Sequence, residues 1–113
     1  ATSTVAENQM LSNSMYVHSI TTNNDNQDIV SMGTNSALAT KTVIENAYEV
    51  QAIQMIALTQ AIDYLNIEDK LSDSTAKAYK KLRNLVPRFV KDTPKYEEIA
   101  ITRDFLYNNR FEY

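Results

Sequence analysis

The sequence predicts an all-α fold in which one long core helix is accompanied by shorter helices. Only one Gly and two Pro occur in 113 residues, whereas an ordinary domain has about 7% Gly, so few positions suit tight turns. Apolar residues recur at helical spacing over much of the chain, and no stretch alternates apolar and polar residues for long enough to predict a strand. At this length the chain forms one domain at most.

The long core helix has several residues that can cap its start. Asp28, Ser31 or Thr34 can serve, because a short polar side chain accepts a hydrogen bond from a free backbone N–H there. Asp28 and Ser31 are interpreted as structural caps. The predicted division of the chain is a short helix and polar loop, then the long core helix, then peripheral helices: residues 1–27, 28–66 and 73–113.

The second half of this helix, residues 47–65, is apolar on most faces. A helix with that pattern is typically buried inside a large protein and does not lie on the surface of a small domain. A helix of roughly 38 residues would also be about 57 Å long, which exceeds the width of a compact fold of this chain alone. The helix therefore needs neighbours, either from another part of the same polypeptide or from other subunits.

Two peripheral helices are expected after a connector at residues 66–73. Ser72 or Ser74 caps the first, which runs to about Val86. Thr93 and Pro94 predict the start of the last helix, because a capping residue followed by Pro at the first helical position is typical of a helix N-terminus. The apolar side of the last helix is expected to comprise Ile99, Ile101, Phe105 and Leu106.

The composition excludes several kinds of partner and site. The net charge of −3 and the pI of about 5.0 give no electrostatic reason to expect nucleic acid or an anionic membrane as a partner. The chain has no Cys, which excludes disulfides and thiolate metal sites and suits the cytoplasm. No charged-then-apolar leader and no run of about 18 apolar residues is present, so a soluble, cytoplasmic protein is expected.

Two further features have simple interpretations. His18 is the single His and has no cluster of other ligands at metal-binding spacing, so no metal site is predicted and His18 is interpreted as a loop residue. Residues 77–81, Lys-Ala-Tyr-Lys-Lys, are interpreted as a solvated helix face and not as a nucleic-acid patch, because the chain as a whole is acidic.

The most distinctive segment is residues 26–33, which read Asn-Gln-Asp-Ile-Val-Ser-Met-Gly and lead from a polar loop into the long helix. This segment resembles the one that opens a core helix in the histidine, phenylalanine and tyrosine ammonia-lyases. The phenylalanine and tyrosine enzymes read roughly Asn-Gln-Asp-x-x-Ser-Met/Leu-Gly there. The histidine enzymes read Gln-Glu-Asp-His-Val-Ser-Met-Gly.

Other matches follow in the same order between about residues 3 and 66. Residues 6–8, Ala-Glu-Asn, match the family's Ser/Ala-Glu-Asn, and residues 17–20, Val-His-Ser-Ile, match Val-Asp-Ser-Ile of the histidine enzymes. Residues 45–46, Glu-Asn, match a similar pair midway along the family's core helix. Residues 61–63, Ala-Ile-Asp, fall where the family reads Ala-Leu-Asp or Gly-Ile-Asp. Beyond residue 66 the resemblance is weak.

The resemblance implies an aspartase-like helical-bundle lyase, of which this chain is the C-terminal part. Such enzymes eliminate ammonia from histidine or an aromatic amino acid to give an α,β-unsaturated acid. They are homotetramers whose active sites draw on several subunits. This chain would then contribute one wall of the active site and helices for subunit assembly, with the upstream polypeptide and other subunits as partners. Lyase and aminomutase activity are not separated by these residues.

The family's cofactor is a methylidene-imidazolone electrophile that forms from a contiguous Ala-Ser-Gly. The only Gly of this chain is Gly33, and Met32 precedes it. The electrophile therefore cannot form from these residues, and no segment matches the family's catalytic Tyr loop. No catalytic residue is expected in this chain, which by itself should be inactive.

Gln27 and Asn26 are the substrate-binding residues that the resemblance implies. At the position of Gln27 the histidine enzymes have Glu, which can pair with an imidazole. A neutral amide loses that charge-assisted hydrogen bond, so Gln27 favours an aromatic side chain in the substrate. The alternatives are that Gln27 is a polar residue at a helix start and that Asn26 forms the turn.

A second functional class stays open on the sequence alone. A chain whose main helix is apolar on most faces associates with something, so it could be a catalytically inactive, stand-alone helical module for oligomerisation or interaction. In that case Gln27 has no substrate to contact. An Ala-Ser-Gly in the same polypeptide would distinguish the lyase from the module.

Overall fold

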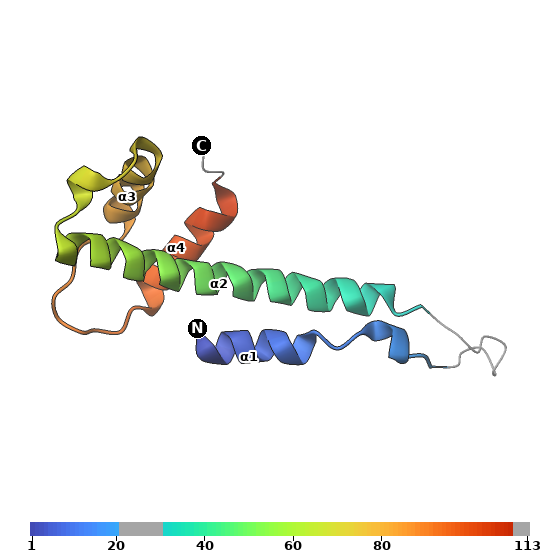
Figure 1. Ribbon diagram of the computed structural model, residues 1–113. Helices are drawn as coiled ribbons and strands as arrows, with labels where there is room; N and C mark the ends of the chain where they lie inside the picture. The colour runs from blue at the N-terminus through green and yellow to red at the C-terminus, as the bar shows by residue number, and fades with distance from the viewer. Residues whose placement is uncertain (21–30, 110–113) are drawn as a thin grey trace. The chain divides into compact units, whose positions relative to one another are not determined.

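A computed structural model describes residues 1–20 and 31–109, and every regular element in these ranges is helical (Figure 1). The predicted all-α fold is confirmed. The backbone divides into two compact units, residues 1–47 and 48–113, and helix α2 contributes to both. The elements in order are α1 (Thr2–Leu11), η1 (Met15–Val17), α2 (Gly33–Leu65), η2 (Glu68–Lys70), α3 (Asp73–Leu85) and α4 (Tyr96–Asn108).

In the first unit, α1 lies antiparallel beside the first half of α2 (Figure 1). Polar side chains join the two helices. The Asn46 amide donates to Glu7 Oε2 at 3.1 Å and to Asn8 Oδ1 at 2.9 Å, and the Asn8 amide donates to the Val43 carbonyl at 3.4 Å. No residue of α1 is buried, so directional hydrogen bonds, more than apolar burial, define this pairing.

In the second unit, a small core forms between the end of α2, α3 and α4. An edge-to-face pair of Tyr48 and Tyr107, with ring centroids 5.2 Å apart, joins α2 to α4, a geometry that aromatic rings favour. The core side chains come from α2, α3, the residue that follows α3, and α4. They are Ala52, Ile56, Tyr79, Leu82, Val86 and Leu106.

Helix α3 begins as its sequence predicts. Ser72 is the N-cap, and its Oγ accepts a hydrogen bond from the Thr75 backbone N–H at 3.3 Å. This bond satisfies one of the donors that a helix start leaves free. Of the two serines that the sequence offered, the structure therefore selects Ser72, while Ser74 lies inside the first turn.

Helix α2 begins at Gly33, later than the predicted start at residue 28. Its first backbone hydrogen bond runs from the Ser36 N–H to the Met32 carbonyl at 3.0 Å, which leaves Ser31 before the helix. Thr34 lies within the first helical turn, so it is not the N-cap. Asp28 lies outside the described residues, and its predicted capping role stays a prediction.

Helix α4 also begins later than predicted, and the predicted cap at Thr93 and Pro94 is wrong. The helix starts at Tyr96 after Lys95, whose φ of −114° and ψ of 20° are not helical. Lys95 is held there by two interactions, a 2.9 Å ion pair with Glu98 and a position 4.3 Å from the centroid of the Phe89 ring. The first helical hydrogen bond runs from the Ile99 N–H to the Lys95 carbonyl at 2.9 Å, so Lys95 is the N-cap and Pro94 lies before the helix.

The buried face of α4 also differs from the expectation. Ile101 is 49% exposed, whereas Thr102 is completely buried and Leu106 is 8% exposed. Residues 99, 102 and 106 share one face at helical spacing, and position 101 points away from it. Apolar character predicted that Ile101 is on the buried face, which is wrong, because Thr102 occupies the position that faces the core.

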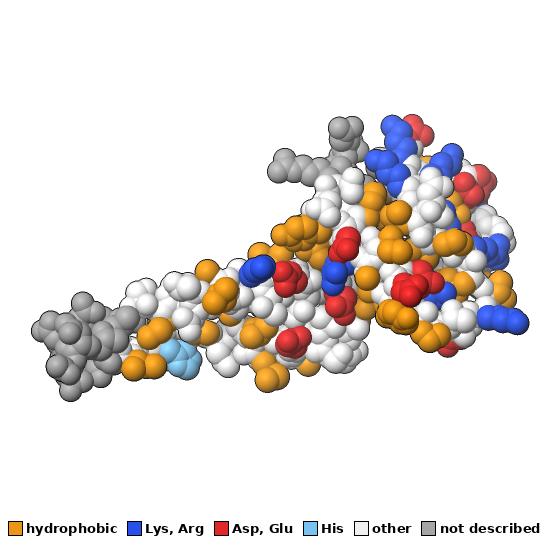
Figure 2. All heavy atoms as spheres, turned by 180° about the vertical axis from the view of Figure 1, so that it is seen from behind, with side chains coloured by type: hydrophobic (Ala, Val, Ile, Leu, Met, Phe, Trp, Pro, Cys, Tyr) orange, Lys and Arg blue, Asp and Glu red, His pale blue; other side chains and the backbone are white. Residues whose placement is uncertain are grey.

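The second half of α2 leaves apolar side chains uncovered by the described part of its own unit. Leu58 is 51% exposed, Tyr64 81% and Leu65 59%. Figure 2 shows hydrophobic side chains, in orange, reaching the surface among charged ones. In residues 1–20 and 31–109, no helix is both long enough and apolar enough to cross a membrane.

Candidate functional site

The predicted substrate-binding residues, Gln27 and Asn26, lie outside the described residues, as does Asp28. Ser31, the other predicted cap, is described. It is exposed and lies directly before α2, with its Oγ 3.5 Å from the point where a Cβ at Gly33 would stand. The capping role of Ser31 stays a prediction.

The segments on either side of residues 21–30 form a hollow of about 370 Å³ in the first unit. One side comes from the turn around η1 and the other from the start of α2. The hollow combines an imidazole and hydroxyl groups with two thioethers, so it offers both hydrogen-bonding and apolar contacts. Its lining residues are Met15, Tyr16, His18, Ser19, Ser31, Met32, Gly33 and Ser36.

His18 belongs to this hollow, which the sequence analysis did not predict. It follows η1, where its backbone N–H donates to the Met15 carbonyl at 3.1 Å, and its side chain is exposed (pale blue in Figure 2). The loop interpretation of His18 agrees with this position. A signal was available in the sequence, because residues 17–20 and 26–33 both match family segments on the two sides of one loop.

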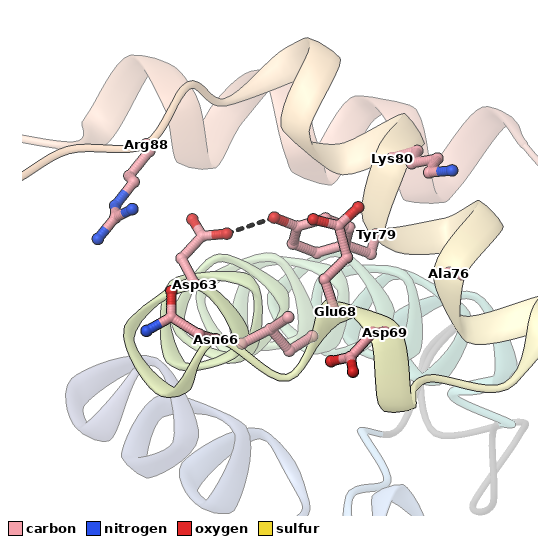
Figure 3. A pocket seen from close by; sticks show the side chains of 9 residues that line it. Asp63, Asn66, Glu68, Asp69, Ala76, Tyr79, Lys80 and Arg88 are labelled. Atoms are coloured by element: carbon pink, nitrogen blue, oxygen red, sulfur yellow. Dashed lines mark hydrogen bonds between the residues drawn. The ribbon is translucent and has the colours of Figure 1, made fainter.

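A buried ion pair lies in the second unit. Arg83 Nη2 of α3 is 2.6 Å from Asp63 Oδ2 of α2, and the two side chains are only 13% and 9% exposed. The Tyr79 hydroxyl donates a hydrogen bond to the other carboxylate oxygen, Oδ1 (Figure 3). Oδ1 of Asp63 therefore accepts a hydrogen bond, whereas Oδ2 is compensated only by the charge of Arg83 and accepts no hydrogen bond.

Arg83 also connects this cluster to the segment that follows α3. Its Nη1 donates to the Val86 carbonyl at 2.9 Å, and its Nη2 donates to Gln60 Oε1 at 3.0 Å. The Gln60 amide in turn donates to the Phe89 carbonyl. The planar guanidinium provides several donors in fixed directions. One side chain thus joins α2, α3 and the segment that follows α3.

The same cluster changes the acidity of Tyr79. The hydrogen bond to Asp63 raises the pKa of the Tyr79 hydroxyl above its ordinary value of 10.0, and burial and the negative charge of Asp63 act in the same direction. The hydrogen bond with Arg83 opposes them. Tyr79 is therefore a neutral hydrogen-bond donor at physiological pH and not a base.

An open pocket lies beside this cluster, lined by groups of both charges (Figure 3). Asp63, Glu68 and Asp69 are acidic, and Lys80 and Arg88 are basic. No group of His, Asp or Glu in the described residues is arranged to hold a metal ion. Because Asp63 is already bonded to Arg83 and Tyr79, the cluster is suited to holding helices together and not to proton transfer.

The sequence analysis singled out residues 61–63 but did not predict the partners of Asp63. Those partners, Tyr79 and Arg83, lie one turn apart on α3, beyond the region of clear resemblance. A Tyr and an Arg at positions i and i+4 share a helix face, which was the available signal. Nothing in the sequence showed that this face meets Asp63.

No residues of this chain suit the electrophile that the resemblance implied. It forms from contiguous Ala-Ser-Gly, whereas the chain's only Gly, Gly33, follows Ser31 and Met32.

Comparison with known families decides the family. Residues 1–84 match the model of the aromatic amino acid lyases. The chain belongs to the aromatic amino acid lyase family. The match includes the hollow around η1, the paired helices α1 and α2, and the Asp63–Tyr79–Arg83 cluster.

Relatives of this chain include several histidine ammonia-lyases. Histidine ammonia-lyase 1 of Fusobacterium nucleatum is 36% identical over 110 residues, which is 97% of this chain and 21% of that enzyme. Histidine ammonia-lyase of Staphylococcus saprophyticus is 38% identical over 106 residues, which is 94% of this chain and 21% of that enzyme. The chain thus spans about a fifth of the length of these relatives.

An aminomutase is also similar to this chain. The MIO-dependent tyrosine 2,3-aminomutase of Streptomyces globisporus is 34% identical over 111 residues, or 98% of this chain and 20% of that enzyme. The crystal structure of tyrosine aminomutase from Streptomyces globisporus superposes with a TM-score of 0.88 at 34% identity, over 93% of this chain and 20% of that one. The helical fold therefore agrees with that of a solved member.

Proposed function

We propose that this chain is part of an ammonia-lyase, in which it contributes one wall of the active site and helices for subunit assembly. The complete enzyme would eliminate ammonia from histidine or an aromatic amino acid to give an α,β-unsaturated acid. The observation that supports this proposal best is the alignment of nearly the whole chain with a fifth of the length of histidine ammonia-lyases. The electrophile would come from residues outside these 113.

The proposed wall comprises Gln27 and Asn26 together with the hollow next to them in the sequence. The hollow provides hydroxyl groups from Ser19 and Ser31 beside the thioethers of Met15 and Met32. Such a surface suits the side chain of an amino-acid substrate, which needs apolar contact and a few directed hydrogen bonds. Under this proposal Gln27 contacts the substrate ring and favours the ring of phenylalanine or tyrosine over the imidazole of histidine.

Exchanging the amide of Gln27 for a carboxylate tests this role. In the complete enzyme, Gln27→Glu is expected to raise the ratio of kcat/KM for histidine to that for phenylalanine or tyrosine by about ten-fold, because a charge-assisted hydrogen bond to imidazole is stronger than a neutral one. Steady-state kinetics with the three amino acids measures the ratio. An unchanged ratio contradicts a position facing the ring.

The proposed assembly role rests on the exposed side chains of α2. Leu58, Tyr64 and Leu65 are more than half exposed in the second unit, and a helix with uncovered apolar side chains suits a subunit or domain interface. A homotetramer built around such helices is the assembly that we propose. The same exposed side chains favour the second candidate, a stand-alone interaction module without activity.

Reading the coding frame around these residues distinguishes the two candidates. A lyase requires an Ala-Ser-Gly in the same polypeptide, and the complete protein should release ammonia from histidine, phenylalanine or tyrosine. Product analysis then separates a lyase, which releases an unsaturated acid, from an aminomutase, which returns the amine to the β-carbon. A polypeptide without Ala-Ser-Gly overturns the lyase proposal and leaves the module.

A further inference from the structure

Two sequence matches that lie far apart in the chain meet in one contact. Residues 6–8 and 45–46 match separate segments of the family, and the structure brings Glu7 and Asn8 of α1 against Asn46 of α2. The three side chains are called the amide cluster below. None of them has a role in the proposed substrate wall, so their contact needs an explanation of its own.

Hydrogen bonds of the amide cluster are donated from α2 to α1 and from α1 to α2. The Asn46 Nδ2 group donates to Glu7 Oε2 at 3.1 Å and to Asn8 Oδ1 at 2.9 Å, which uses both of its hydrogens. The Asn8 Nδ2 group donates back to the Val43 carbonyl at 3.4 Å. Asn8 and Asn46 are both partly buried, where water competes less for such bonds.

This arrangement fixes the register of α1 along α2. Apolar packing is not directional, and α1 has no buried side chain that would define its position. The amide hydrogen bonds, in contrast, are satisfied only when positions 7 and 8 face position 46. A slip of one residue along a helix moves every following atom by about 1.5 Å.

Helices α1 and α2 lead into the hollow from its two sides, and they are called its stems. The chain leaves α1 at Leu11, passes through the turn that contributes Met15 and His18, and returns through Ser31 into α2. A slip of about 1.5 Å at the stems would displace one side of the hollow against the other. Active-site geometry tolerates only about 0.5 Å of displacement, so a shift of this size would weaken the contacts of the wall with the substrate.

We propose that Glu7, Asn8 and Asn46 are positioning residues that lock the register of α1 on α2 and thereby set the two sides of the substrate wall. This inference rests on the proposed function, because the wall has a substrate only if the complete protein is a lyase. The cluster does not touch the substrate. It acts through the stems.

A charge exchange within the cluster tests the proposal in the complete enzyme. Asn46→Asp removes both amide donors and places a carboxylate against Glu7. It is expected to lower kcat/KM by about ten-fold, mainly through a higher KM, because the wall is displaced while the reactive groups elsewhere are not. The double variant with Glu7→Gln returns an amide donor from the α1 side and is expected to recover most of the loss.

Glu45→Gln is the matched control. Glu45 is adjacent on α2, its side chain is 55% exposed, and it faces Lys41 and not α1, so kcat/KM should change less than about two-fold. Hydrogen exchange of residues 2–11 provides a readout that is independent of activity. Exchange there should be about ten-fold faster in Asn46→Asp and close to wild type in the double variant.

Several results would overturn the positioning role. They are an unchanged kcat/KM in Asn46→Asp, a loss of kcat at constant KM, which indicates only fewer active molecules, and a loss that the double variant does not recover. If Asn46→Asp does not assemble, the double variant must restore assembly, and its failure also overturns the role. A wild type inactive on all three amino acids overturns the proposed function, while exchange in α1 still decides whether the cluster fixes the helix pair.

Discussion

At the scale of single residues, Asp63 is a nearly buried carboxylate that is paired with a nearly buried Arg. Its side chain is 9% exposed and lies 2.6 Å from Arg83. Asp63→Asn leaves the Arg83 charge buried without its counter-charge, and breaking a buried pair on one side costs about 3 kcal/mol. In the full-length polypeptide, hydrogen exchange of α3 should therefore become about a hundred-fold faster.

Asp104→Asn is the control for this variant. Asp104 also pairs with an Arg, Arg103, at 2.9 Å, but its side chain is 64% exposed. Ion pairs at the surface contribute about 0 to 1 kcal/mol, because water and salt screen them. Similar exchange rates in the two variants would contradict a structural role for the buried pair.

The stability of the fold should also depend on pH through Tyr79. Its raised pKa means that folding favours the neutral phenol. The stability that this adds is fully present below the unfolded value of about 10 and is lost as the pH rises through the higher folded value. Titration of tyrosinate absorbance should show one late component that is absent in Tyr79→Phe. Tyr64→Phe, at a side chain that is 81% exposed, should retain it.

At the scale of elements, the helices could be predicted from the sequence, but two helix starts and one buried face could not. Helix spacing and the Ser72 cap are local properties, so they could be read from neighbouring residues. Helix α4 starts at Tyr96 and not at Pro94, although Thr93 and Pro94 have the residue types of a helix start. The burial of Thr102 depends on what packs against it. Local pattern does not include such tertiary contacts.

The Ser72 cap should stabilise α3 measurably. Ser72→Ala removes the acceptor of the Thr75 N–H, and loss of an N-cap costs about 1 kcal/mol. Exchange of α3 in the full-length polypeptide should become about five-fold faster. Ser74→Ala changes a serine of the first turn that is not the N-cap and should have a smaller effect. Equal effects of the two substitutions on exchange would contradict a stabilising role of the Ser72 cap.

At the scale of the whole molecule, family and fold class could be predicted from the sequence, because several short motifs of the family occur in it in the family's order. The candidate site could be predicted only in part. Gln27 and Asn26 came from a motif and lie outside the described residues, so their place against the hollow is part of the proposal. The amide cluster and the Asp63 cluster each join residues distant in sequence, and one chain without its fold does not reveal such pairs.

The 113-residue chain on its own should associate in solution. Because α2 leaves Leu58, Tyr64 and Leu65 exposed in the second unit, the isolated chain is not expected to be a stable monomer. Sedimentation velocity should show oligomers or larger species at micromolar concentration. Leu58→Glu with Leu65→Glu places charges on this face and should shift the distribution toward smaller species. Val90→Glu, at a side chain that is 92% exposed and outside α2, should not. A compact, well-folded wild-type monomer would contradict the prediction, because burial of these side chains against other subunits or domains would then be unnecessary.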